Sequence, residues 1–201
     1  RALRIPTWPV TINRLVSALA LPAVRLVSRT QPLREEVEVV RRFDERSDRL
    51  WERMAGRFAI AVRRDARYLN WKYVEPPHVR YTAALLRRGE KVDGYVVYRH
   101  LREPQGRVTQ IVDLLADPAD ERGLKTLARW VDREARAADS DKIRCYATHA
   151  AFRRVLRRSG YFMVKSSIDL TVKVNALTAP KGFYETADNW HFMLGDGELD
   201  H

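Results

Sequence analysis

Apolar and polar residues alternate along four short runs between residues 36 and 115. This period of two predicts β-strands, because successive side chains of a strand point to opposite faces. The runs are residues 36–43, 81–87, 94–101 and 108–115. Short turns at 88–91 and 104–106 separate the last three runs, so we expect these strands to form an antiparallel meander.

Other segments repeat apolar residues every three or four positions, which predicts helices. The clearest is residues 119–138, where Leu124, Leu127 and Val131 share one face. Asp44 is placed to cap the start of an earlier helix. The shorter predicted helices are residues 44–56, 64–73 and 149–158.

Further strands complete the predicted order. A strand at 142–147 follows the long helix, and a strand pair is expected at about 161–174 and 190–194. A meander followed by a βαβ-like crossover is an α+β pattern. We therefore expect one mixed sheet with helices on both faces.

Residues 1–33 stand apart from this pattern. The apolar spacing of residues 11–28 predicts an amphipathic helix broken near Pro22. We interpret 1–33 as an N-terminal extension or the remnant of an upstream lobe, and 34–201 as the main domain. A basic amphipathic helix also suits a membrane surface, but docking of its apolar face on protein is the favoured interpretation.

The composition is that of a globular domain. A chain of 201 residues with 45% apolar residues is long enough for one packed core. The single cysteine, Cys145, excludes a disulfide framework and a cysteine-based zinc site, and it suits a cytoplasmic location. No apolar run approaches the ~20 residues that cross a bilayer. The chain begins with Arg1, so we expect it to be part of a longer protein.

The charge balance is basic, with 37 Lys and Arg against 26 Asp and Glu and a net charge of +11. Such a surface attracts nucleic acid, a lipid surface or a phosphate-bearing cofactor, but it equally serves solubility. Basic and acidic residues are interleaved along the sequence, and there is no dense basic tail. Charge alone does not choose between these partners, and we do not expect nucleic acid.

Most enzyme motifs are absent from the sequence. There is no nucleophile elbow, no P-loop, no Rossmann glycine pattern and no zinc-protease motif. The five histidines lack metal-ligand spacing, so no metal is expected. Tyr68, Trp71 and Tyr73 would suit stacking on a base, but their helical spacing favours packing in the core.

Residues 111–127 carry the most specific signal. An apolar strand passes through an Asp-Pro loop into a helix whose first turn contains Arg122, Gly123 and Lys125. Free N–H groups at a helix start, together with nearby cations, suit the pyrophosphate of a cofactor.

This strand–loop–helix, followed by Val155-Leu156-Arg157-Arg158-Ser159-Gly160-Tyr161, resembles the GNAT N-acetyltransferase superfamily over residues 36–174. Residues 64–73 (RDARYLNWKY) and 190–196 (WHFMLGD) are similar to a branch related to the Fem-like two-lobed transferases. The resemblance implies a sheet splayed where strand 108–115 parts from strand 142–147, with acyl-CoA as co-substrate. It implies that acyl-CoA is bound by Asp113, Leu114, Leu115, Arg122, Gly123, Leu124 and Lys125.

Acyl transfer requires a base for the attacking amine and an acid for the leaving thiolate. Asp113 is the candidate base, because a carboxylate among apolar residues binds a proton more readily than one in water. A structural role, in which its oxygens accept nearby backbone N–H groups, is the alternative. Tyr146 and His149 flank the end of strand 142–147, and either is a candidate acid.

Two departures from the family pattern keep a second function open. The phosphate-binding loop is short and contains only one of the family's glycines, Gly123. Leu156 stands at a position where many relatives have a tyrosine that serves as the general acid. We expect acyl transfer by direct attack of a small amine, an amino sugar or a polysaccharide precursor. The alternative is a catalytically degenerate lobe that acts as a scaffold or binding module. The partner protein in either case would be an upstream GNAT lobe or a second copy.

Overall fold

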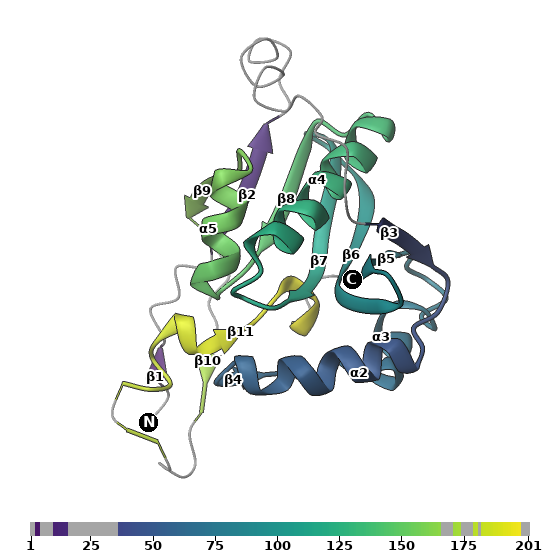
Figure 1. The fold of residues 1–201 in the computed structure, drawn as a ribbon. Helices are drawn as coiled ribbons and strands as arrows, with labels where there is room; N and C mark the ends of the chain where they lie inside the picture. The colour runs from purple at the N-terminus through teal and green to yellow at the C-terminus, as the bar shows by residue number, and fades with distance from the viewer. Residues whose placement is uncertain are drawn as a thin grey trace.

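The computed structural model describes residues 3–4, 10–15, 36–165, 171–173, 179–180 and 182–197. Its centre is a seven-stranded mixed sheet with the order β3-β5-β6-β7-β8-β2-β9 (Figure 1). The strands are β2 (Val10–Leu15), β3 (Glu36–Val40), β5 (Thr82–Arg88), β6 (Lys91–Glu103), β7 (Gly106–Ala116), β8 (Lys142–Tyr146) and β9 (Phe162–Lys165). Two small sheets pair β1 (Leu3–Arg4) with β10 (Thr171–Val172) and β4 (Ile60–Ala61) with β11 (Trp190–His191).

The helices lie close to the segments that the apolar spacing predicts. They are α2 (Glu45–Met54), α3 (Ala66–Tyr73), α4 (Glu121–Ala137) and α5 (Ala150–Arg158), with short 3-10 turns η1 (Ala55–Arg57), η2 (Ala187–Asn189) and η3 (Leu194–Asp196). Asp44 caps α2 as expected, since its side chain accepts the Arg46 N–H at 3.0 Å. Among the described residues, no helix has the length and apolar character that a membrane crossing requires.

The predicted meander and crossover are confirmed. Strands β3, β5, β6 and β7 pair in antiparallel fashion, and β7 then pairs with β8 in parallel after the α4 crossover. Helix α4 covers one face of the sheet, where its Glu134 accepts the Tyr98 hydroxyl. Helix α3 covers the other face, where its Tyr73 reaches Asp113. The fold is therefore the expected α+β class, with helices on both faces.

The helix predicted over residues 11–28 is wrong for residues 11–15. These residues form β2, which lies between β8 and β9 and pairs antiparallel with both (Figure 1). Its first four residues, Val-Thr-Ile-Asn, alternate apolar and polar side chains, and two strand partners favour that period over the helical one. Residues 10–15 thus share the sheet of the 34–201 domain. Residues 16–35, and the rest of the predicted helix with them, lie outside the described residues.

The strand pair expected at 161–174 and 190–194 is also wrong. Strand β9 pairs with β2, β10 pairs with β1, and β11 pairs in parallel with β4. Each partner comes from the first third of the chain. The period of the sequence identifies a strand but not its distant neighbour, which is why the pairing was missed.

Strands β6 and β7 form the centre of the core, with side chains buried on both faces. Gly94 on β6 lies directly under α4, so that an added Cβ would be 2.7 Å from the Leu115 carbonyl oxygen and 3.3 Å from Leu127. This close approach requires the absence of a side chain at that position.

Gly94→Ala is therefore expected to lower the free energy of unfolding by about 1–3 kcal/mol, because the methyl group collides with Leu115 and Ala116 of β7 and crowds Leu127 of α4. Urea denaturation followed by circular dichroism measures the change. The matched control is Gly56→Ala, since no atom lies within 4 Å of the added Cβ there. Equal stability of the two variants would contradict this account of the packing.

Candidate active site

The sheet opens between β7 and β8. Only Val108–Ile111 of β7 pair with Lys142–Cys145 of β8, although β7 continues to Ala116. Val97 pairs with Asp113 and Tyr98 with Ile111, so Val112 is an extra residue that bulges from the β6–β7 ladder. The expected splay is confirmed by this register, and it begins at the bulge.

The segment after β11 lies along one side of the split. Met193 forms an isolated bridge with Ala147 just beyond β8. The Thr148 hydroxyl donates to the Trp190 carbonyl at 2.6 Å, and the Phe192 N–H donates to that hydroxyl oxygen at 3.0 Å. Chain residues far apart in sequence are therefore held together at the end of β8.

Turn η3 packs directly on the bulge. A Cβ on Gly195 would lie 3.1 Å from the Val112 carbonyl oxygen and would collide with the Tyr73 hydroxyl. Met193 and Leu194 are buried in the core. Residues 190–196 thus close the side of the split that faces α3.

A buried ionic cluster fixes this segment in place. The Arg64 Nε donates to Asp113 Oδ1 at 3.2 Å, and its Nη2 donates to Asp196 Oδ2 at 2.5 Å. The side chains of all three residues have zero exposure. Arg64 also donates from Nη1 to the Val62 carbonyl at 2.8 Å, which orients the guanidinium plane.

Four groups donate to the two oxygens of Asp113. Oδ1 accepts from Arg64 and from the Leu114 N–H at 2.9 Å. Oδ2 accepts from the Tyr95 hydroxyl at 2.8 Å and the Tyr73 hydroxyl at 3.3 Å. These are the contacts expected if Asp113 has a structural role, in which its oxygens accept hydrogen bonds from nearby groups. Its role as the base remains a prediction.

The cluster holds one cation and two carboxylates. Burial alone would lower the pKa of Arg64, but Asp113 and Asp196 outweigh that effect and raise it, so Arg64 is charged. Burial raises the pKa of Asp196 to about 6, although Arg64 opposes this change. Asp196 Oδ1 is buried without a hydrogen-bond partner among the described residues. A proton on Asp196 would balance the charge of the cluster.

His191 lies at the edge of the same cluster. Its ring stacks on Phe58 with the ring centres 4.3 Å apart. Burial lowers the pKa of His191 well below its ordinary value, and Arg64 acts in the same direction, so the ring is neutral. Neither ring nitrogen of His191 forms a hydrogen bond with the described residues. The nearby Leu114 backbone acts to raise the pKa of the ring, but burial outweighs this effect.

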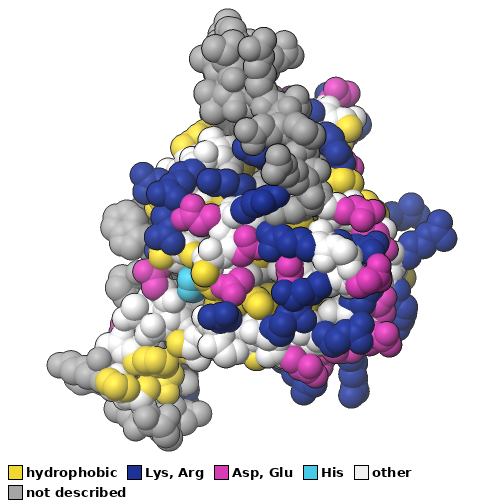
Figure 2. Space-filling model, viewed as in Figure 1, with side chains coloured by type: hydrophobic (Ala, Val, Ile, Leu, Met, Phe, Trp, Pro, Cys, Tyr) yellow, Lys and Arg dark blue, Asp and Glu magenta, His cyan; other side chains and the backbone are white. Residues whose placement is uncertain are grey.

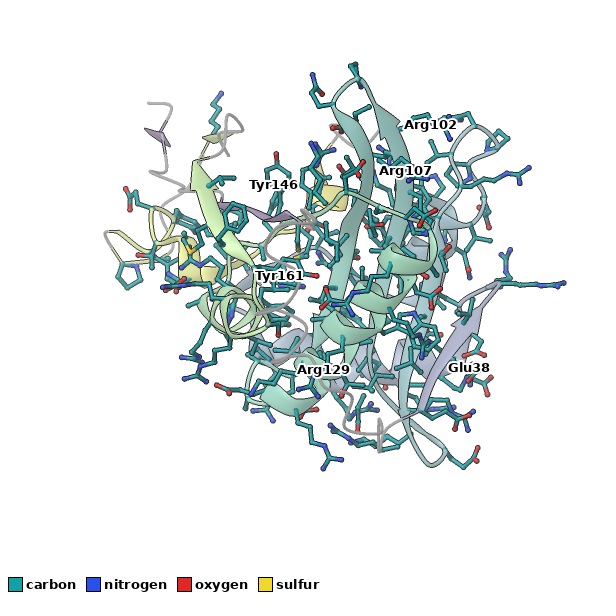
Figure 3. The ribbon with its side chains drawn as sticks, turned by 90° about the horizontal axis from the view of Figure 1, so that it is seen from above. Glu38, Arg102, Arg107, Arg129, Tyr146 and Tyr161 are labelled. Carbon is teal, nitrogen blue, oxygen red and sulfur yellow. The ribbon has the colours of Figure 1, made fainter. Side chains whose placement is uncertain are left out.

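The two candidate acids lie at the end of β8. His149 caps α5, with its Nδ1 accepting the Ala151 N–H at 3.3 Å. Burial lowers the pKa of His149, so the ring is neutral and its proton is on Nε2. Tyr146 is partly buried against the core, and Figure 3 shows it well apart from the β6–β7 hairpin that carries Arg102 and Arg107.

The predicted cofactor residues divide into two groups. Asp113, Leu114 and Leu115 lie on the part of β7 that β8 leaves unpaired, and their side chains are buried. Arg122, Gly123, Leu124 and Lys125 form the first turn of α4, where Gly123 and Leu124 are buried and Arg122 is exposed. The first group therefore lies just before the β7–α4 loop and the second group just after it.

The start of α4 already carries carboxylates. Asp120 is the N-cap: its Oδ1 accepts the Gly123 N–H at 3.0 Å, and its Oδ2 contacts Arg88 at 2.7 Å. Glu121 in the first turn contacts Arg158 at 2.8 Å. A Cβ on Gly123 would strike the Asp120 carboxylate, so this glycine serves the cap. Figure 2 shows the same mixture over this face, with dark-blue cations and magenta acids side by side.

Sequence reasoning assigned no role to Arg64, Asp196 or Asp120. The sequence does contain a signal for the capping role of Asp120, because an Asp just before an amphipathic helix is a common N-cap. Arg64 and Asp196 lie 132 positions apart, and no local pattern reports such a contact. Within the described segments, no group of three or more His, Cys, Asp or Glu side chains is placed to hold a metal ion.

No protein-family model matches the sequence, and no curated protein matches it. Among solved structures, the chain is similar to a GCN5-related N-acetyltransferase from Anabaena variabilis, with 13% identity and a TM-score of 0.53. The match covers 67% of this chain and 34% of that protein. A ribosomal-protein-alanine N-acetyltransferase from Brucella melitensis matches with 14% identity and a TM-score of 0.48, over 71% of this chain and 99% of that one. The chain has the GNAT fold, as the resemblance implied, and the Fem-like branch remains a prediction.

Arg64→Met is expected to lower the free energy of unfolding by about 3–5 kcal/mol, because it leaves two buried carboxylates without their cation. Chemical denaturation measures the loss. Arg67→Met is the matched control, since Arg67 is exposed on the same segment, and it should change stability by less than about 0.5 kcal/mol. Similar stability of the two variants would contradict the assigned role of Arg64.

Asp196→Asn tests the proton on Asp196. The pKa of Asp196 is about 6 in the folded chain against an ordinary value of 3.8, so the folded chain takes up this proton first as the pH falls. The stability of wild type relative to Asp196→Asn should therefore rise from about pH 7 down to about pH 4. His191 acts in the opposite direction but is present in both proteins, so it cancels. A pH-independent difference would contradict the prediction.

Proposed function

We propose that this chain is an acyltransferase that takes an acyl group from an acyl-CoA thioester and transfers it to an amine. One observation carries the proposal: β7 leaves β8 at the Val112 bulge, inside a GNAT fold. Past Ile111, β7 pairs with β6 and with no second strand of the described part of the chain. A ligand that extends along this edge can hydrogen-bond to it as an added strand does.

The pantetheine arm of the donor suits this edge. It would lie along the main chain of Asp113, Leu114 and Leu115, whose side chains are buried and hold the strand rigid. The phosphates would lie at the first turn of α4, near Arg122 and Lys125. Because Asp120 and Glu121 already occupy that helix start, side-chain cations rather than backbone N–H groups would provide most of the attraction.

The chemistry is a direct displacement. The amine nitrogen attacks the thioester carbonyl carbon, the carbon–sulfur bond breaks, the amine loses a proton and the leaving thiolate gains one. His149, whose Nδ1 is engaged with Ala151, would donate a hydrogen bond from Nε2 to the leaving sulfur. It would transfer a proton to the thiolate only from its protonated form, since a neutral imidazole is too weak an acid. Tyr146 at the end of β8 is the second candidate acid. Asp113 is retained as the candidate base, acting from within its contacts with Arg64.

The acceptor follows from the resemblance and not from the geometry. A small amine, an amino sugar or a polysaccharide precursor is the acceptor that the resemblance implies. A cytoplasmic location, and an upstream lobe or second copy as partner, belong to the same proposal.

A non-catalytic GNAT lobe is the second candidate function. It is favoured by the carboxylates at the start of α4 and by the full set of hydrogen bonds on Asp113. Such a lobe would use the same fold as a scaffold or binding module.

Isothermal titration with acetyl-CoA separates the two candidates. If the donor binds as proposed, titration releases heat, and Arg122→Ala weakens the affinity by about tenfold through loss of a charge-assisted phosphate contact. Release of free thiol in the presence of amine and amino-sugar acceptors then tests turnover.

The matched control is Arg136→Ala, an exposed arginine in the last turn of the same helix. It should bind acetyl-CoA as wild type does. No heat from folded wild-type protein would contradict the acyltransferase and favour the scaffold.

A further inference from the structure

The outer face of α3 carries an exposed aromatic side chain that the core does not use. Helical spacing predicts that Tyr68, Trp71 and Tyr73 pack in the core, and this holds for Tyr73, which is 4% exposed. Trp71 is instead 61% exposed. It is the bulkiest of the exposed hydrophobic side chains among the described residues, and Val62, which is 38% exposed, lines the same hollow of the surface.

Trp71 stands between two grooves. The larger, about 880 Å³, is also lined by Arg67, Tyr68 and Val62, and the smaller, about 360 Å³, is lined by Lys72. Tyr68 tilts against Trp71 with the ring centres 5.8 Å apart and supports it from within the larger groove. The larger groove has the size of sites that hold small molecules.

The larger groove is also cationic. Three arginines line it, and two of them are paired: Arg42 with Glu75 at 3.0 Å and Arg63 with Asp65 at 2.5 Å. Arg67, four positions before Trp71 on the same helix, has an exposed side chain that forms no ion pair or hydrogen bond with the described residues. Residues four apart lie on the same side of a helix, so a guanidinium and an indole are presented together.

We propose that this groove binds a small anion that contains a ring. The ring would stack on Trp71, and a phosphate or carboxylate on it would pair with Arg67. The acids Asp65 and Glu75, which also line the groove, would accept hydroxyl groups of the ligand. The indole of Trp71 favours a ring, and the guanidinium of Arg67 favours an anionic group. A ligand that carries both a ring and an anionic group would contact both side chains.

The groove lies on the α3 side of the sheet and close to the buried cluster. Burial raises the pKa of Tyr68, and the charges of Asp196 and Asp113 add to this effect, so the floor of the groove is within electrostatic range of both carboxylates. The proposal stands without acyl transfer, since the groove is formed by α3 and its neighbours and not by the β7 edge.

Titration calorimetry without any acyl-CoA tests the proposal. Glucose 6-phosphate and uridine monophosphate are the two probes, because a sugar phosphate and a nucleotide present the same chemistry from different sources. At least one should bind at least tenfold more tightly than its uncharged parent and than inorganic phosphate. The probe that binds identifies the source.

Variants locate the binding. Trp71→Ala and Arg67→Ala should each weaken the better probe at least tenfold, while Trp71→Phe, which keeps a ring, should retain part of the affinity. Arg102→Ala, at the exposed β6–β7 hairpin, is the control and should bind as wild type does. Thermal unfolding checks that each variant is folded. If Trp71→Ala is not folded, the affinity of Arg67→Ala decides the outcome. Absence of saturable binding by both probes, or binding unchanged in Trp71→Ala and Arg67→Ala, would overturn the proposal.

Discussion

The ion pairs of one buried arginine connect three distant parts of this chain. Arg64 precedes α3, Asp113 lies on the central strand β7, and Asp196 ends η3. Removing these charges from water costs several kcal/mol per ion, so the cluster persists only because its partners are held in position. Tyr73 and Tyr95 add hydrogen bonds to Asp113. Arg64 therefore makes the α3 face of the sheet and the C-terminal segment parts of one unit.

That coupling determines what the split between β7 and β8 can do. The register alone leaves an open edge after Val112, and such an edge in water would invite pairing with another chain. Residues 190–196 cover one side of it, and their position depends on Arg64. The other side faces the start of α4, where a donor would enter. The ionic cluster thus forms one wall of the candidate active site, and Asp113 lies in that wall.

Local signals explain which parts of the fold were predictable. The meander, α4 and the Asp44 cap are specified by residues close in sequence, through period, turn and capping chemistry. The sequence does not identify strand β2, because a segment of six residues is too short to separate the two periods, and its pairing partners lie at least 127 positions away. The same distance hid the contact of Arg64 with Asp196, although both residues lie in segments that the family resemblance singled out. Sequence patterns identify elements, whereas pairing between them depends on the whole chain.

The two ends of the proposed donor path rest on different kinds of interaction. Along β7 the main chain itself would be the binding group, so the edge after Val112 would accept an arm with little dependence on the side chains around it. At the start of α4 binding depends on side chains, and there Asp120 competes directly with a phosphate for the same N–H groups. Loss of donor binding would therefore begin at α4, with the split intact. A chain with this sequence would therefore keep the GNAT fold and the split even if the exposed cations at the start of α4 were lost.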